Sequence, residues 1–141
     1  MESATRIRRR SMGIYLFREP GNSGGGVLTE PVSAPTAEHY AWAEVCDGWH
    51  LVRGEALSVI EERMPPGAGE ERHFHIRARQ FFYVLDGELT MEIESAIHRL
   101  SARQGIEIVP GKRHQARNES RADARFLVIS TPPGQGDRTP S

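Results

Sequence analysis

The chain has 141 residues, with 18 Lys and Arg against 19 Asp and Glu, so its formal net charge is −1. This length suits one domain with its own core. The balanced charge excludes a protein that neutralises a nucleic-acid backbone along its length, and the basic run at 6–10 is typical of a solvated terminus.

The apolar segments of the chain are short. None reaches the length of a membrane span, and residues 13–17 fall short of the apolar region of a secretory signal. Cys46 is the single cysteine, so no intramolecular disulfide forms. No basic residue adjoins it in sequence, which favours a small buried residue over a nucleophile. We expect a cytoplasmic protein with neither nucleic acid nor membrane as a partner.

The composition changes along the chain. Residues 1–37 are rich in Arg, Ser, Gly and Pro and lack sustained periodicity, which predicts a flexible N-terminal arm. From 38 to 132, short alternating apolar runs are separated by Gly and Pro turns, and no helical stripe is present. This pattern predicts an all-β sandwich or barrel, followed by a C-terminal tail at 133–141.

Two Asp-Gly pairs stand between alternating runs, Asp47-Gly48 and Asp86-Gly87. Asp-Gly readily adopts the positive φ angles of tight hairpin turns. We therefore expect a hairpin turn at each pair. These turns would set the register of the strands, and hence the face on which each side chain lies.

His73 and His75 are two residues apart on a predicted strand. Side chains at positions i and i+2 share a face, so the two imidazoles point the same way. A divalent metal would satisfy both, because neutral imidazole is a common metal ligand. The alternative is a pair of surface histidines on a strand edge.

Gln80 begins the next run, where it shares a face with Phe82 and Val84. Its amide oxygen is a candidate for completing a metal site. Phe81 and Tyr83 make the opposite face apolar as well, which predicts an inner strand between two packed layers.

A third histidine, His114, follows a Pro-Gly turn. With it, the chain resembles the cupin family over residues 55–131, because two spaced motifs match. The matching positions are Gly67, His73, His75, Gln80 and Gly87 in the first motif, with Gln80 in the usual glutamate place, and Gly111, His114 and Asn118 in the second. The departures are Arg103 and Gln104, where Gly-Asp is usual, and Val109 in place of a proline.

The resemblance implies a jelly-roll β-barrel, the double-stranded β-helix, with one metal ion in its mouth. The ligands would be His73, His75 and His114, and the metal Zn, Fe(II), Mn or Ni. Gln80 would be a fourth ligand that leaves the full cation charge, or a residue that orients a water molecule from outside the ligand set. Phe82 would line the pocket beside the metal, or belong to the core.

The resemblance further implies a metal-dependent enzyme acting on a small polar molecule, anionic or carbonyl-bearing, such as a dioxygenase, isomerase, lyase or cyclase. The alternatives are a non-catalytic metal- or metabolite-binding cupin that works with a partner protein, and a metal-free structural barrel. No catalytic acid or base is identified, because strand parity cannot be carried from Glu61 and Glu62 across the following turn. Residues 39–45 are suited to pairing with a second subunit, so we expect a homodimer.

Overall fold

The computed structural model describes residues 6–10, 13–17 and 29–141. Within these residues every regular element is a strand, and no helix is long and apolar enough to cross a membrane. The strands are β1 (Arg6–Arg10), β2 (Gly13–Phe17), β3 (Glu38–Trp42), β4 (Cys46–Arg53), β5 (Ser58–Met64), β6 (His73–His75), β7 (Arg79–Asp86), β8 (Glu88–Ile93), β9 (Ala96–Ser101), β10 (Gly105–Ile108), β11 (His114–Arg117), β12 (Ala124–Thr131) and β13 (Arg138–Pro140).

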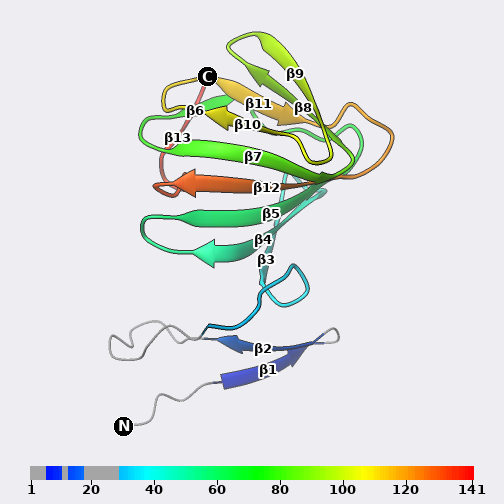
Figure 1. The fold of residues 1–141 in the computed structure, drawn as a ribbon, viewed down its shortest axis with the longest axis vertical. Coiled ribbons are helices and arrows are strands. Elements are labelled where there is room, and N and C mark those ends of the chain that lie inside the picture. The colour runs from blue at the N-terminus through cyan, green and yellow to red at the C-terminus, as the bar shows by residue number, and fades with distance from the viewer. Residues whose placement is uncertain (1–5, 11–12, 18–28) are drawn as a thin grey trace.

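The strands after residue 29 form two sheets (Figure 1). One has six strands in the order β10-β7-β12-β5-β4-β3, and the other has five in the order β13-β6-β11-β8-β9. Every pairing is antiparallel. The predicted all-β jelly-roll class is therefore confirmed, and β3 lies at a sheet edge as expected.

The predicted arm contains β1 and β2, which pair antiparallel. The rest of residues 1–28 lies outside the described residues. Residues 133–141, the predicted tail, include β13, which pairs with β6. The C-terminal residues therefore extend the sheet that carries all three candidate histidines.

Alternation along the strands builds the core between the sheets. On β7 the side chains of Gln80, Phe82 and Val84 are buried, as their shared face predicts. The largest fully buried apolar side chains are Phe126, Met64, Leu89, Met91, Val84 and Cys46, in agreement with the expected burial of the cysteine. Burying a large apolar side chain stabilises the fold by about 1.5–3 kcal/mol, so these strands provide much of the driving force.

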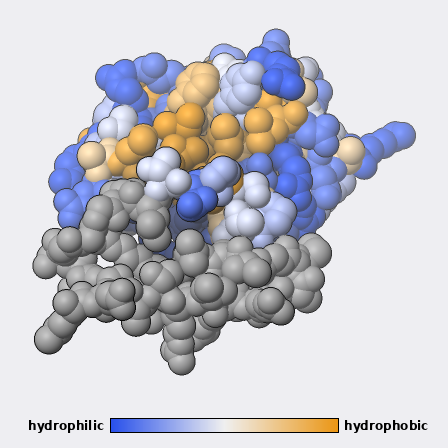
Figure 2. All heavy atoms as spheres, turned by 60° about the horizontal axis from the view of Figure 1, so that its bottom comes forward, coloured by the Kyte–Doolittle hydropathy of each residue, from blue (hydrophilic) through white to orange (hydrophobic). Residues whose placement is uncertain are grey.

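The outer face of β7 differs from the prediction. Phe81 is 39% exposed and stacks on Tyr83 with ring centroids 6.3 Å apart. The expectation of an inner strand between two layers is therefore wrong. Aromatic residues suit a pleated surface even where one face meets solvent, so an apolar pattern on both faces does not require a second layer. Figure 2 shows apolar side chains gathered in a band on one face of the molecule.

The Asp47-Gly48 hairpin prediction is also wrong. Both residues lie inside β4, and the turn between β3 and β4 is made by Ala43 and Glu44, with φ of 46° and 65°. Gly48 lies opposite Tyr40 on β3. A Cβ at Gly48 would overlap the Tyr40 ring, so this glycine makes room for a side chain.

The prediction for Asp86-Gly87 is correct for the positive φ angle but wrong for the hairpin turn. Gly87 has φ of +79°, the left-handed conformation that glycine favours. It joins β7 to β8, however, and these strands lie in different sheets. The pair therefore forms a corner where the chain passes between sheets, and a Cβ at Gly87 would overlap the carbonyl oxygen of Asp123.

Candidate metal centre

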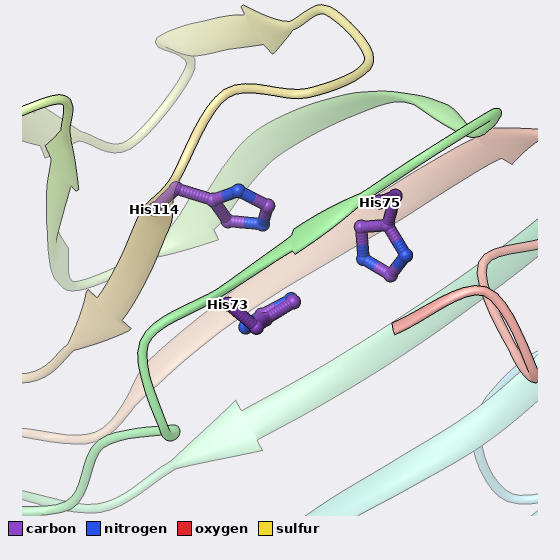
Figure 3. Close-up of side chains that lie close together, drawn as sticks. All are labelled: His73, His75 and His114. Atoms are coloured by element: carbon purple, nitrogen blue, oxygen red, sulfur yellow. The ribbon is translucent and has the colours of Figure 1, made fainter. Parts of the chain in front are cut away.

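The three histidines of the two motifs come together in the fold. His73 and His75 are the ends of β6, and His114 begins β11, where it lies opposite His73. One nitrogen from each ring lies within 4.8 Å of the others. Figure 3 shows the three rings around a common space. Antiparallel pairing of β6 with β11 thus brings together residues that are far apart in sequence.

Backbone carbonyls fix the orientation of two rings. His73 Nδ1 donates to the carbonyl of Glu71 at 2.8 Å, and His114 Nδ1 donates to the carbonyl of Lys112 at 2.9 Å. A carbonyl can only accept, so each Nδ1 carries the proton and each Nε2 presents a lone pair. His114 Nε2 is buried without a hydrogen-bond partner. A metal ion is the group that such an arrangement fits.

Burial keeps the three imidazoles neutral. Desolvation is the main cause that lowers the pKa of His73, to about 3, and the neighbouring imidazole of His114 lowers it further. Desolvation likewise lowers the pKa of His75 and His114. Neutral imidazole is the form that binds metals, so the site holds its ligands in the required state at neutral pH.

Gln80 lies buried on β7, with its side chain inside the barrel. Its Nε2 donates to Ser130 Oγ at 3.0 Å. Its Oε1 is buried without a hydrogen-bond partner. Three imidazole nitrogens and one amide oxygen form a donor set that suits a divalent transition metal, and coordination by Gln80 remains a prediction.

Phe82 lies between this centre and the core. Its ring centroid is 6.3 Å from that of His114, edge to face, and 6.1 Å from that of Phe126. The side chain is 3% exposed. Phe82 is thus beside a candidate ligand and also part of the core, so the two readings of the sequence are compatible.

The C-terminal segment forms a wall of the centre. A Cβ built on Gly134 would lie 3.0 Å from His75 Cε1 and 3.3 Å from Gln80 Nε2. The carboxylate of Asp137 accepts hydrogen bonds from the backbone N–H groups of residues 76–78 at 2.9–3.2 Å. These contacts hold the segment against the residues that follow His75.

Two carboxyl groups line the barrel interior: that of Glu62, whose orientation the sequence left open, and that of Glu70, which sequence reasoning missed. Burial raises the pKa of Glu62 to about 8 and that of Glu70 to about 7. Glu70 Oε1 lies 4.0 Å from His73 Nδ1 and accepts from the backbone N–H of Ala116 at 2.9 Å. The signal for Glu62 was its parity with the apolar Ile60 on the same strand.

The comparisons with known proteins agree with this fold. The chain is 32% identical over 69 residues to the protein named polyketide synthase CurC from Streptomyces cyaneus, a match that covers 49% of this chain and 45% of that protein. The chain therefore spans less than half the length of this relative.

Solved structures show the same fold. An RmlC-like cupin from Shewanella frigidimarina superposes with a TM-score of 0.67 at 19% identity, over 74% of this chain and 92% of that one. A predicted oxalate decarboxylase from Thermotoga maritima gives 0.67 at 17% identity, over 74% and 100%. The cupin domain family matches residues 60–130, half of the chain. The chain belongs to the cupin family.

Proposed function

We propose that the protein is a metal-dependent enzyme that acts on a small, enolisable carbonyl compound. The observation that carries this proposal is the set of three buried, neutral imidazoles with a nitrogen of each within 4.8 Å of the others. His73, His75 and His114 would hold the metal, with the Oε1 of Gln80 as a fourth ligand. When bound, a divalent metal supplies a Lewis acid that polarises a carbonyl oxygen.

The charge of the centre supports a carbonyl or anionic substrate. All four proposed ligands are neutral, so they leave the charge of Zn, Fe(II), Mn or Ni undiminished. The cation of Arg138 on β13 also acts on the site, since it lowers the pKa of His73, His75 and His114. A positive centre favours a substrate oxygen on which negative charge develops.

The name of the sequence relative supports a narrower proposal for the substrate class. It is named a polyketide synthase, and polyketide chains carry repeated carbonyl groups separated by acidic carbons. We therefore propose a carbonyl-rich intermediate as the substrate, and ring closure or isomerisation as the reaction. A dioxygenase acting on the same enolisable carbon is the redox variant of this proposal.

The test uses 2,4-pentanedione as a simple enolisable probe. The metal content of the purified protein is measured first, and exchange of the central hydrogens is then followed by proton NMR in D₂O, with oxygen uptake in parallel. We expect the metal-loaded protein to accelerate exchange, and oxygen uptake only with iron. Binding of the probe without faster exchange would indicate a non-catalytic binding protein.

We also propose that the protein is a cytoplasmic homodimer. β3 lies at the edge of the six-stranded sheet, and within the described residues no further strand pairs with its outer side. Such an edge can pair with a strand of a second subunit. Light scattering at micromolar concentration should give twice the mass of the chain. A monomer under these conditions would contradict the proposed assembly.

A further inference from the structure

Glu62 points into the space between the two sheets. It lies on β5, opposite Gly48 on β4 and Phe126 on β12. Ile60 and Met64, two residues away on either side, are 7% and 0% exposed. Because alternate residues share a face, Glu62 occupies the same inner face as these core side chains.

Tyr40 reaches Glu62 across a glycine. Tyr40 on β3 lies opposite Gly48, which in turn lies opposite Glu62, so the three residues form a row across three strands. The Tyr40 hydroxyl donates to Glu62 Oε1 at 3.1 Å. A Cβ at Gly48 would overlap the Tyr40 ring, so only glycine at this position allows the ring to cross β4 and reach Glu62.

The Glu62 carboxyl forms no ion pair with any residue of 29–141. The adjacent Glu61 faces outward and pairs with Arg125 at 2.9 Å. Burial is the main cause that raises the pKa of Glu62 to about 8, and the charge of Glu70 raises it further. Both the acid and the carboxylate form are therefore populated near neutral pH.

Glu62 and the histidines share the barrel interior. Glu70, whose charge acts on Glu62, has its Oε1 4.0 Å from His73 Nδ1. The Arg138 cation acts on Glu62 and on each of the three histidines. Glu70 thus lies beside a candidate ligand, and the charges of Glu70 and Arg138 act on Glu62, which faces the same interior.

We propose that Glu62 is the proton-transfer residue of this centre and that Tyr40 is the positioning residue that orients its carboxyl. This inference rests on the proposed function. In the forward step a C–H bond breaks at the carbon that lies between two carbonyl groups. The electron pair of this bond forms the enolate, whose negative charge lies on oxygen. The proton forms an O–H bond on Glu62. The reverse transfer returns the proton to carbon, so no further reactant is needed.

Several ionisable groups face Glu62 and must be included when its titration is interpreted. They are Tyr40 from β3, Cys46 from β4, Glu70 from the loop before β6 and Arg138 from β13. The hydrogen bond from Tyr40 and the Arg138 charge both lower the pKa of Glu62. Tyr40→Phe should therefore raise the pKa of Glu62 further, because the hydrogen bond to its carboxyl is lost.

The experiment compares metal-loaded wild type, Glu62→Gln, Tyr40→Phe and Glu61→Gln, the last as an outward-facing control on the same strand. Metal content, the ¹³C NMR titration of labelled Glu carboxyls and the exchange rate of 2,4-pentanedione are measured for each. We expect all four to hold metal equally. Glu62→Gln should lose one carboxyl signal that titrates near neutral pH and about 100-fold or more in exchange rate. Glu61→Gln should match wild type.

The outcomes separate the two proposals. If metal-loaded wild type does not accelerate exchange, the proposed reaction fails, and the role of Glu62 fails with it. If wild type is active and Glu62→Gln exchanges at the same rate, the role of Glu62 is overturned while the proposed function stands. The carboxyl of Glu70 also titrates near neutral pH, so one such signal is expected to remain in Glu62→Gln. An unchanged number of near-neutral carboxyl signals in Glu62→Gln also overturns the role of Glu62. In Tyr40→Phe, an upward shift of the Glu62 titration supports the positioning role, and an unchanged titration overturns it.

Discussion

Charged side chains have different partners on the two faces of the six-stranded sheet. On the outer face Asp47 pairs with Arg63 at 2.6 Å, and Glu61 pairs with Arg125, whose guanidinium lies 5.0 Å from the Trp49 ring centroid. On the inner face the Glu62 carboxyl accepts a hydrogen bond from the Tyr40 hydroxyl and forms no ion pair with any residue of 29–141. Ionisable groups left uncompensated in an interior are candidates for function, because their protonation state responds to a ligand.

Of the substitutions considered, Glu62→Gln should have the largest effect, which is on the pH dependence of the free energy of unfolding. The pKa of Glu62 is raised in the folded state from 4.5 to about 8, so its contribution is present at pH 4 and is lost as pH rises through about 8. Between pH 5 and 9, Glu62→Gln should therefore lose less stability than wild type, by on the order of 3 kcal/mol. Urea unfolding at each pH measures this difference.

Glu61→Gln is the matched control, because Glu61 lies on the outer face of the same strand and pairs with Arg125. It should keep the wild-type pH dependence. If the free energy of unfolding changed equally with pH in wild type and Glu62→Gln, ionisation of Glu62 would not destabilise the fold. The proposed contrast between the two faces would then be contradicted.

Gly48→Ala should destabilise the fold by about 1–3 kcal/mol, as overpacking does. The added Cβ in Gly48→Ala overlaps the Tyr40 ring and displaces its hydroxyl from Glu62. In a Tyr40→Ala background the same substitution should cost little, because the overlapping ring is gone. A double-mutant cycle by denaturant unfolding measures the coupling, and additive effects would contradict the explanation.

Outer-face substitutions should have the smallest effect. Arg125→Ala removes an ion pair and a contact with the Trp49 ring, both near solvent, so we expect a loss of at most about 1 kcal/mol. The loss should shrink further at high salt, since screening already weakens the pair. A salt-independent loss of several kcal/mol would show that outer charges matter as much as inner ones.

Motif spacing predicted that His73, His75 and His114 lie together, and part of this prediction follows from local rules. The i, i+2 rule places His73 and His75 on one face, and the spacing of Gln80 sets its burial on the next strand. Whether Glu62 faces the same interior as His73 was not predicted, because the irregular residues between β5 and β6 break strand parity. The orientation of Glu62 became fixed only through the pairing of β5 with β4 and β12.

The Asp-Gly pairs show why turn chemistry alone was insufficient. Glycine is required wherever a Cβ would clash or φ is positive, and a hairpin is only one such place. At Gly48 the requirement is a tyrosine ring that crosses the strand, and at Gly87 it is a corner between sheets. Both depend on contacts with residues from other segments of the chain, Tyr40 and Asp123, which the sequence around each glycine does not reveal.

The metal content of the purified protein tests the central claim most directly. Wild type, His114→Ala and His98→Ala are each loaded with Zn, Fe(II), Mn or Ni, desalted and analysed for bound metal. His98 is the control, because it is an exposed histidine on β9 outside the cluster. Wild type and His98→Ala should retain about one equivalent, and His114→Ala should retain almost none. Absence of metal from wild type with all four ions, or unchanged retention in His114→Ala, would contradict a three-histidine metal centre.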